Sequence, residues 1–205
     1  MGAAIRAHQL RVRYGSRDVL RGVSLEIGPA DAVALVGRSG SGKTTLLLAL
    51  AELLPPSGGT VEISSGATVV YVPQAPSLLP ELTALENVML ALRLRGTDPA
   101  VAADRAHRRL EELGLRDAID ALPHELSAGM AARTALARAL VLDPTVLLVD
   151  EPTGSLDRVT GRRVLGMLLE RARESKAVVV ATHDAEVASR LARRVELTDG
   201  ALAAA

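Results

Sequence analysis

A glycine-rich segment, Gly37-Arg38-Ser39-Gly40-Ser41-Gly42-Lys43-Thr44, contains the residue types that bind a phosphate group. Glycines allow successive backbone N–H groups to surround phosphate oxygens, while a lysine reaches the outer phosphates and a threonine hydroxyl ligates Mg²⁺. The apolar run Ala32 to Val36 predicts a buried strand before the segment, and Thr45 to Leu53 predicts a helix after it. This order indicates a phosphate-binding loop rather than a glycine-rich turn without a ligand.

Two adjacent carboxylates, Asp150 and Glu151, follow a second apolar run, Val146 to Val149. A continuous apolar run is typical of a central parallel strand, and ligands of α/β proteins bind at the carboxyl ends of such strands. We therefore expect Asp150 to hold the Mg²⁺ shell through water and Glu151 to polarise the attacking water. The alternative is that both residues simply cap a strand.

Three more polar or aromatic residues occupy positions where they could reach the same ligand. His183 follows the apolar run Ala177 to Ala181, which places it at the sheet edge of Glu151 and favours a γ-phosphate contact over a core histidine. Gln74 follows a predicted strand, so its amide could reach a Mg²⁺-bound water, although a lone loop glutamine is normally solvated. Tyr14 stands before Gly15, where its ring could stack on a purine or serve in packing.

Hydrophobic periodicity predicts the elements that position these residues. Alternating residues predict two antiparallel strands on one edge, and a capping-box spacing of Thr83 and Glu86 predicts a helix to Leu94. A second helix near Asp98 to Leu113 completes a helical insertion after Gln74. The other expected elements are strands at Ile5–Arg13, Val19–Ile27, Thr60–Ile63, Ala67–Val72 and Arg194–Thr198, and helices after the N-cap Ser127 to Leu142, at Arg158–Glu174 and at Ala185–Ala192.

Composition limits the possible classes of function. With 205 residues, 48% of them hydrophobic, the chain has enough core for one domain. Lys+Arg and Asp+Glu both number 24, so no net charge favours nucleic acid. The chain lacks cysteine, a signal peptide and an apolar run long enough to span a bilayer, which predicts a soluble cytoplasmic protein. His107 and His124 have no second ligand at metal spacing.

Taken in order, these segments resemble the ATP-binding cassette of ABC transporters over essentially the full chain. The matching segments are Tyr14 (aromatic loop), Gly37 to Thr44 (Walker A), Gln74 (Q-loop), Leu126 to Met130 (signature), Val146 to Glu151 (Walker B and catalytic glutamate), Ser155 to Asp157 (D-loop) and His183 (H-loop). The resemblance implies an α/β P-loop NTPase fold of ABC type, with a central, mostly parallel sheet, an antiparallel β edge and an inserted α-helical subdomain. One domain, 1–205, would comprise a nucleotide-binding core (1–75 and 143–205) and a helical subdomain (76–142).

The resemblance also implies ATP and Mg²⁺ as ligands and ATP hydrolysis coupled to transport. Catalysis would fall to Glu151, His183 and Gln74, and Mg²⁺ would be held by Thr44, Gln74 and Asp150. Nucleotide binding would involve Tyr14, Gly37, Arg38, Ser39, Gly40, Ser41, Gly42, Lys43, Thr44, Thr45, Ser127, Gly129 and Asp157.

The same resemblance implies partners. Two cassettes would pair head to tail, with each ATP between the Walker A loop of one and the signature of the other. Separate transmembrane permease subunits would meet the Gln74 loop and the helical subdomain. The chain would then lie at the inner face of the cell membrane, touching it only through the permease.

Two departures from the family pattern affect these expectations. Ala128 and Met130 replace a glycine and a glutamine of the usual signature, Leu-Ser-Gly-Gly-Gln, which predicts weaker contacts across the dimer. A homodimer is slightly favoured over a heterodimer with a stronger signature. The second departure is a short spacing from Lys43 to Gln74, which resembles that of metal-ion importers. The sequence around Glu86 and Glu151 instead resembles that of lipoprotein-releasing and macrolide or peptide exporters. A non-transport ABC ATPase or an ATP-sensing regulatory module is the alternative function.

Overall fold

The computed structural model describes residues 2–203, and the chain divides into two compact units. The first unit comprises Met1–Tyr71, Thr145–Glu151 and Leu165–Ala205, and the second comprises Val72–Pro144 and Pro152–Val164. The single domain 1–205, with divisions at 75 and 143, stays a prediction. No helix in the described part of the chain is both long and apolar enough to cross a membrane.

The first unit contains an antiparallel sheet in the order β2-β1-β4, formed by β1 (Ile5–Tyr14), β2 (Arg17–Ile27) and β4 (Gly58–Ile63). The buried face of β1 carries Ile5, Ala7, Leu10 and Val12. The register with β2 shifts between Ala7 and Leu10, where Gln9 adopts φ 47°, so a bulge keeps these two side chains on one face. The antiparallel pairing predicted for the first two strands is confirmed, and the strands form a sheet of their own.

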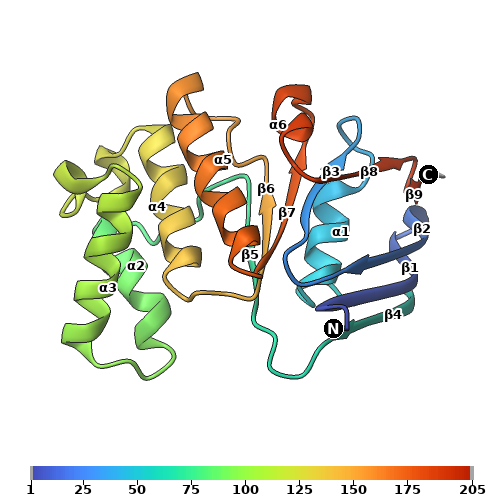
Figure 1. The fold of residues 1–205 in the computed structure, drawn as a ribbon, viewed down its shortest axis with the longest axis horizontal. Helices are drawn as coiled ribbons and strands as arrows, with labels where there is room; N and C mark the ends of the chain where they lie inside the picture. Colours follow the sequence, from blue (N-terminus) through green and yellow to red (C-terminus); the bar gives the residue numbers. More distant parts are fainter. Residues whose placement is uncertain (1, 204–205) are drawn as a thin grey trace. The chain divides into compact units, whose positions relative to one another are not determined.

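The remaining strands form a six-stranded sheet (Figure 1), in which β6 ends at Asp150 and β7 ends at Thr182, directly before His183. Its order is β5 (Val69–Val72), β6 (Val146–Asp150), β7 (Ala177–Thr182), β3 (Ala32–Val36), β8 (Arg193–Thr198) and β9 (Ala201–Leu202). The pairs β6–β7, β7–β3 and β3–β8 are parallel, and β3, β6 and β7 are buried along their whole length. The predicted parallel central strands are therefore confirmed. The antiparallel strand β9 was not predicted from its alanine-rich sequence.

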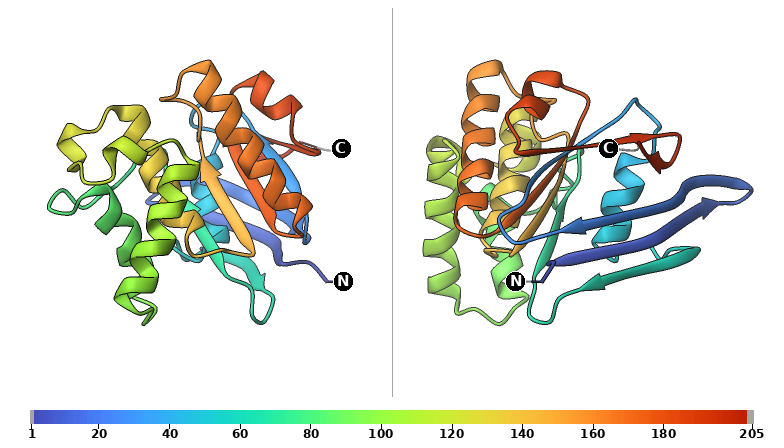
Figure 2. Two further views of the ribbon diagram at one scale, coloured as in Figure 1. Left: turned by 60° about the vertical axis from the view of Figure 1, so that its left-hand side comes forward. Right: turned by 45° about the vertical axis from the view of Figure 1, so that its right-hand side comes forward.

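Helix α1 (Lys43–Leu50) packs against both sheets of the first unit (Figure 2). Leu46, Leu47 and Leu50 are fully buried in a core shared with the strands. The predicted extension of this helix to Leu53 is wrong, because Glu52 turns into the left-handed region at φ 56° before two prolines. Helix α6 (Ala185–Ser189) contacts β3 and β7 and is also shorter than predicted.

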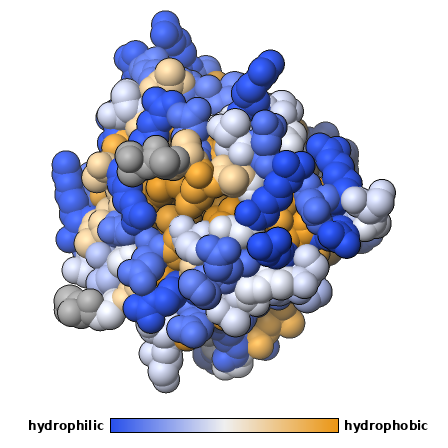
Figure 3. Space-filling view, turned by 90° about the vertical axis from the view of Figure 1, so that its right-hand side faces the viewer, coloured by the Kyte–Doolittle hydropathy of each residue, from blue (hydrophilic) through white to orange (hydrophobic). Residues whose placement is uncertain are grey.

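The surface of the first unit near β9 and the β1–β2 hairpin is mostly polar, with apolar surface in its middle (Figure 3). Partly buried apolar residues such as Val61, Val195 and Leu202 pack against the core beneath.

The second unit contains three mutually packed helices, α2 (Ala84–Arg93), α3 (Pro99–Glu112) and α4 (Ala128–Leu140), and the first residues of α5 (Arg158–Arg173). Thr83, Asp98 and Ser127 cap the three helices, and the predicted capping box of Thr83 and Glu86 is present. Two short 3₁₀ turns, Arg116–Ala118 and Pro123–Glu125, join α3 to α4.

Candidate nucleotide-binding site

The glycine-rich loop connects the buried strand β3 to the N-terminus of α1, as its sequence predicts. Gly40 and Gly42 adopt φ of +78° and +105°, which side chains of L-residues rarely tolerate. A Cβ at Gly37 would lie 2.4 Å from the carbonyl oxygen of Leu197, so this position has room only for glycine. Arg38 and Ser39 are exposed at the rim of the loop. The loop therefore presents backbone to an incoming ligand at a helix N-terminus, which favours an anion.

Two polar side chains of the loop lie buried beneath it. The Lys43 Nζ atom donates to the carbonyl oxygens of Gly37 at 2.9 Å and Arg38 at 3.3 Å, and the residue is only 8% exposed. The Ser41 hydroxyl is buried and has no hydrogen-bond partner among the described residues. A buried cation and an unsatisfied hydroxyl inside a glycine loop fit a phosphate ligand, which would supply the missing partner.

Asp150, at the end of β6, is joined to the loop by a hydrogen bond. The hydroxyl of Thr44, the second residue of α1, donates to Oδ2 of Asp150 at 2.6 Å, and Asp150 is 3% exposed. Burial raises the pKa of Asp150, against the hydrogen bond from Thr44, which lowers it. Burial is likewise the main reason why the pKa of Tyr71 rises to about 12, and the neighbouring Asp150 carboxylate adds to it. The phenol therefore stays protonated and able to donate.

These oxygen atoms suit Mg²⁺. The described residues contain no group of three or more His, Cys, Asp or Glu side chains that could hold a metal ion by themselves. Mg²⁺ keeps several waters and takes one or two protein oxygens together with substrate phosphates. The hydroxyl of Thr44 and the carboxylate of Asp150 fit such a shared shell, to which the phosphates of a ligand would add oxygens. His107 does not belong to this group of oxygen atoms: its Nδ1 lies 3.8 Å from the carboxylate of Glu111 on the same helix.

Glu151 and His183 meet at the carboxyl ends of β6 and β7. Glu151 adopts φ 47°, while its backbone N–H donates to the carbonyl of Ala181 at 2.9 Å. Its carboxylate accepts the backbone N–H of His183 at 3.1 Å, and its Oε1 lies 2.7 Å from the ring Nδ1. The Glu151 side chain is 10% exposed and the His183 side chain 73%. A nearly buried carboxylate is thus oriented by a histidine that reaches solvent.

Tyr14 lies at the end of β1, opposite Arg17 across the hairpin, and is 51% exposed. An aromatic ring so exposed contributes little to the core, which leaves its face free for stacking. Thr45, also in the first unit, follows Thr44 in the first turn of α1 and is half-buried.

The second unit carries the other sequence-predicted residues. Gln74 is exposed after β5, at the start of a loop whose Pro76 and Ser77 carbonyls accept hydrogen bonds from Arg138 of α4 at 3.1 and 3.0 Å. The loop continues to Leu79, which exchanges hydrogen bonds with the fully buried Asn87. Sequence reasoning missed Arg138, because its backbone partners are more than 60 residues away, and Asn87, because its partners are backbone groups of the preceding loop.

Ser127 and Gly129 lie at the N-terminus of α4. The Ser127 hydroxyl accepts the N–H of Met130 at 3.2 Å, and its own hydrogen remains available for donation. A Cβ at Gly129 would come within 3.3 Å of the Ser155 carbonyl and the Leu156 side chain, so glycine permits close packing there. The expected cap at Ser127 is confirmed.

Asp157 acts as a helix cap in this structure. Its carboxylate accepts hydrogen bonds from the N–H groups of Val159 and Thr160 at 3.0 Å and from the Thr160 hydroxyl at 2.6 Å. The hydroxyl and N–H groups of Thr160 hold the pKa of Asp157 below its usual value. The nucleotide contact expected of Asp157 remains a prediction.

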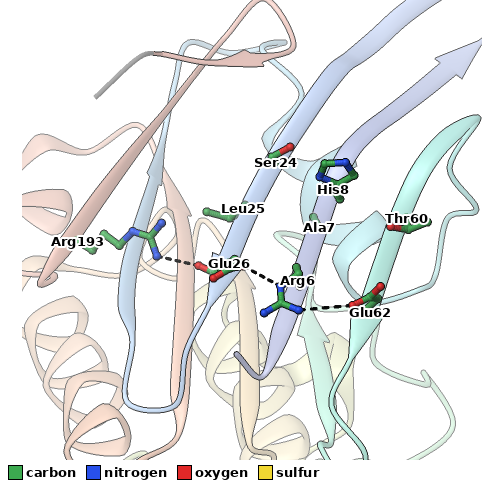
Figure 4. A pocket seen from close by; sticks show the side chains of 9 residues that line it. All are labelled: Arg6, Ala7, His8, Ser24, Leu25, Glu26, Thr60, Glu62 and Arg193. Carbon is green, nitrogen blue, oxygen red and sulfur yellow. Dashed lines mark hydrogen bonds and ion pairs between the residues drawn. The ribbon is translucent and has the colours of Figure 1, made fainter. Parts of the chain in front are cut away.

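A separate cavity of about 520 Å³ lies on the antiparallel sheet (Figure 4). A row of paired charges crosses it: Arg6 lies 2.7 Å from Glu26 and 3.8 Å from Glu62, and Arg193 donates to the Glu26 carbonyl at 2.8 Å. The row links neighbouring strands, and Arg193 also pairs with Asp31 at 3.3 Å.

Known proteins resemble this chain along most of its length. Residues 20–154 match the family described as ABC transporter. The chain is 44% identical over 204 residues to the lipoprotein-releasing system ATP-binding protein LolD of Myxococcus xanthus, covering 91% of each. It is 46% identical over 201 residues to the aliphatic sulfonates import ATP-binding protein SsuB 2 of Nocardia farcinica, covering 97% of this chain and 82% of that protein.

A solved structure shows the same fold. The dimeric post-hydrolysis state of the ATP-binding cassette MJ0796 bound to ADP and Pi has a TM-score of 0.91 and 30% sequence identity, with coverage of 98% of this chain and 97% of that one. The fold class predicted from the sequence is confirmed.

Proposed function

The chain belongs to the ABC transporter family as an ATP-binding cassette, and from this premise we propose that it hydrolyses Mg·ATP to drive separate permease subunits. ATP binding and ATPase activity follow from the family. The dependence on Mg²⁺ and the coupling to transport are the parts that we propose.

One observation carries the proposal: the 2.6 Å hydrogen bond between Thr44 and Asp150, residues that are 106 positions apart. It brings the glycine loop and the β6 carboxylate to one point, where Lys43 is also buried. In our proposal the loop N–H groups and Lys43 hold the outer phosphates, and Thr44 and Asp150 hold the metal. Bound Mg²⁺ would neutralise charge developing on the transferred phosphoryl group.

Glu151 is proposed as the general base. Its carboxylate is nearly buried and fixed by His183, so it can orient one water and accept its proton as the water attacks. His183, whose side chain is 73% exposed, would in addition contact the γ-phosphate through its other ring nitrogen. Gln74 would help to hold Mg²⁺ and would respond to the presence of that phosphate.

A second cassette completes the proposed site. The solved relative is dimeric, and the family has ATP-binding subunits in transporters. We propose that Ser127 and Gly129 of one chain contact the γ-phosphate held by its partner, with a homodimer slightly favoured over a heterodimer. Asp157 would lie at the same interface.

The permease would give the chain its place at the inner face of the membrane. The Gln74 loop and the helical segment 76–142 are proposed to contact it. Relatives named for lipoprotein release and for sulfonate import are 44% and 46% identical, so identity favours neither direction of transport.

The experiment that tests the proposal is phosphate release from ATP by the purified chain, with Mg²⁺ or with a chelator in excess. We expect ATP hydrolysis only when Mg²⁺ is present. The Lys43→Ala variant should lose both ATP binding and hydrolysis. Lys176→Ala, immediately before β7 and far from the loop in the sequence, is the control. Metal-independent turnover would contradict the mechanism, and co-purification with ribosomes or DNA instead of a membrane protein would contradict the transport role.

A further inference from the structure

A second cavity, of about 220 Å³, lies on the hairpin of β1 and β2. Its walls come from these two strands and from the residue before β4, all in the first unit. The lining residues are Arg11, Arg13, Asp18, Leu20, Arg21 and Ser57. None of them is among the residues that we assign to ATP or Mg²⁺, so the cavity needs an explanation of its own.

Three guanidinium groups and one carboxylate line this cavity. The carboxylate is already paired, because the Nε atom of Arg13 donates to Oδ1 of Asp18 at 2.7 Å. Arg11 and Arg21 form no ion pair with a carboxylate in the part of the chain that the structure describes. The cavity therefore has two positive charges that no acidic side chain matches.

The strand register places the two unmatched arginines directly opposite each other. Arg11 of β1 pairs with Arg21 of β2 across the antiparallel ladder. Both arginines are exposed, whereas the adjacent Val12 and Leu20 are buried on the other face of the sheet. Like charges in directly opposite positions destabilise an antiparallel pair. The hairpin thus bears a repulsion that an anion between the two guanidinium groups would replace with attraction.

Backbone contacts anchor both arginines. The carbonyl of Arg11 accepts the N–H of Ser57 at 2.8 Å, and a Cβ at Gly58 would lie 3.5 Å from Cδ of Arg11, so the stem of this side chain runs along the glycine. The N–H of Arg21 donates to the carbonyl of Gly200 at 2.8 Å. Ser57 adds its hydroxyl to the same cavity. Donors that extend from an anchored backbone lose less conformational entropy when a ligand binds.

We propose that this cavity binds a phosphate-type oxyanion, inorganic phosphate or a phosphomonoester, between Arg11 and Arg21. A planar guanidinium can donate two parallel hydrogen bonds to phosphate oxygens, and two unmatched positive charges balance a dianion. A concave site of about 220 Å³ suits a compact anion better than the broad face of an acidic protein. The inference goes beyond the proposed function and uses none of the residues assigned to ATP.

Calorimetric titration with inorganic phosphate tests the site, with Mg²⁺ and a non-hydrolysable ATP analogue in excess so that the glycine loop is already filled. Arg11→Gln and Arg21→Gln should each bind phosphate about 5–10-fold more weakly than the wild type. Arg6→Gln is the matched control, because it removes the same charge from the same sheet at an arginine that Glu26 and Glu62 already pair. No saturable phosphate binding in the wild type, or equal weakening in Arg6→Gln, would overturn the inference.

Titration with glycerol phosphate identifies the source of the oxyanion. If it competes with inorganic phosphate and binds at least as tightly, the site takes a phosphomonoester. If only inorganic phosphate binds, the site takes the free ion. Either result supports the cavity as an oxyanion site, provided that Arg21→Gln weakens the binding.

Thermal unfolding gives a second readout and shows whether the variants fold. In phosphate-free buffer of low ionic strength, Arg21→Gln should melt about 1–3 °C above the wild type, because the repulsion from Arg11 is gone. Phosphate should raise the melting temperature more than sodium chloride of equal ionic strength does, and this excess should be smaller in Arg21→Gln than in Arg6→Gln. An equal excess in the two variants would be a general effect of the salt on the protein surface, and the inference would fail.

Discussion

His183 holds the carboxylate of Glu151 by one oxygen: Oε1 accepts the His183 backbone N–H at 3.1 Å and lies 2.7 Å from the ring Nδ1. An ionised carboxylate only accepts hydrogen bonds, so Nδ1 carries the hydrogen in this contact. The other oxygen, Oε2, is contacted by the Thr182 hydroxyl at the longer distance of 3.3 Å. His183 thus fixes the direction of the carboxylate while Oε2 stays the better placed to accept a hydrogen bond from water.

Glu151→Gln should retain ATP binding and lose hydrolysis by about 10²–10⁴-fold, the usual contribution of a general base. The glutamine carbonyl can still accept both His183 contacts, so the local geometry should survive while the base is lost. Steady-state phosphate release and nucleotide titration measure the two effects. Glu81→Gln, an exposed position in the second unit, is the matched control. Unchanged hydrolysis in Glu151→Gln would remove Glu151 from the mechanism.

His183→Ala should lower hydrolysis by about 10–100-fold, because the Glu151 carboxylate loses its ring partner and keeps only the backbone N–H of residue 183 and the longer contact with the Thr182 hydroxyl. In a Glu151→Gln background the same change should add less than about 2-fold, since the residues act as one unit. Single-turnover kinetics at saturating ATP measure both. His8→Ala, an exposed histidine on the antiparallel sheet, serves as control. Additive losses would mean that the two side chains act separately.

Tyr14→Ala should weaken ATP affinity by about 5–150-fold, the equivalent of about 1–3 kcal/mol for loss of one base-stacking ring. Tyr14→Phe should bind nearly as well as the wild type, because stacking uses the ring and not the hydroxyl. Fluorescence titration with a nucleotide analogue checks both. Equal affinity in all three proteins would show that the exposed ring does not touch the base.

Asn87→Ala should destabilise the protein by about 2–4 kcal/mol, because it removes four part-buried hydrogen bonds from a fully buried side chain to the backbone of the preceding loop. The side-chain amide donates to the carbonyls of Leu79, Leu82 and Thr83 at 2.8–3.1 Å and accepts the N–H of Leu79. Thermal unfolding followed by circular dichroism measures the loss. Thr83→Ala, which removes only the cap of the same helix, should cost about 1 kcal/mol. Equal effects of the two changes would contradict the special role given to Asn87.

Local sequence signals predicted much of the fold. The capping box at Thr83 and the buried run Val146 to Val149 specify their structures within a few residues, and both are present. Signals of helix ends were weaker, since Leu53 continues an apolar pattern yet is 63% exposed beyond the end of α1. Burial along a predicted helix was also uncertain: Leu110 of α3 is fully buried, whereas Val101 of the same helix is 50% exposed.

The geometry of the site was less accessible from the sequence. The motif order identified Thr44, Asp150 and His183, but contacts between distant side chains depend on strand register, which the sequence does not state. Thr44 and Asp150 show this most clearly, because the two residues joined by a 2.6 Å hydrogen bond are 106 positions apart. The use of Asp157 as a helix cap was equally hidden, since its partners depend on the exact start of α5.

Glu151→Gln should form an ATP-dependent dimer, and restoring the usual signature should strengthen it. The Ser127 hydroxyl remains able to donate, but Met130 offers no amide to a nucleotide across the interface. Changing Ala128→Gly and Met130→Gln together would add one hydrogen-bonding side chain at each of two sites. At about 0.5–1.5 kcal/mol for each bond, the protein concentration for half-dimerisation should fall by about 10-fold. Light scattering over a concentration series with Mg·ATP measures it. If both proteins bind ATP and both remain monomers, the γ-phosphate contact requires a different cassette, and the heterodimer replaces the homodimer as the working form.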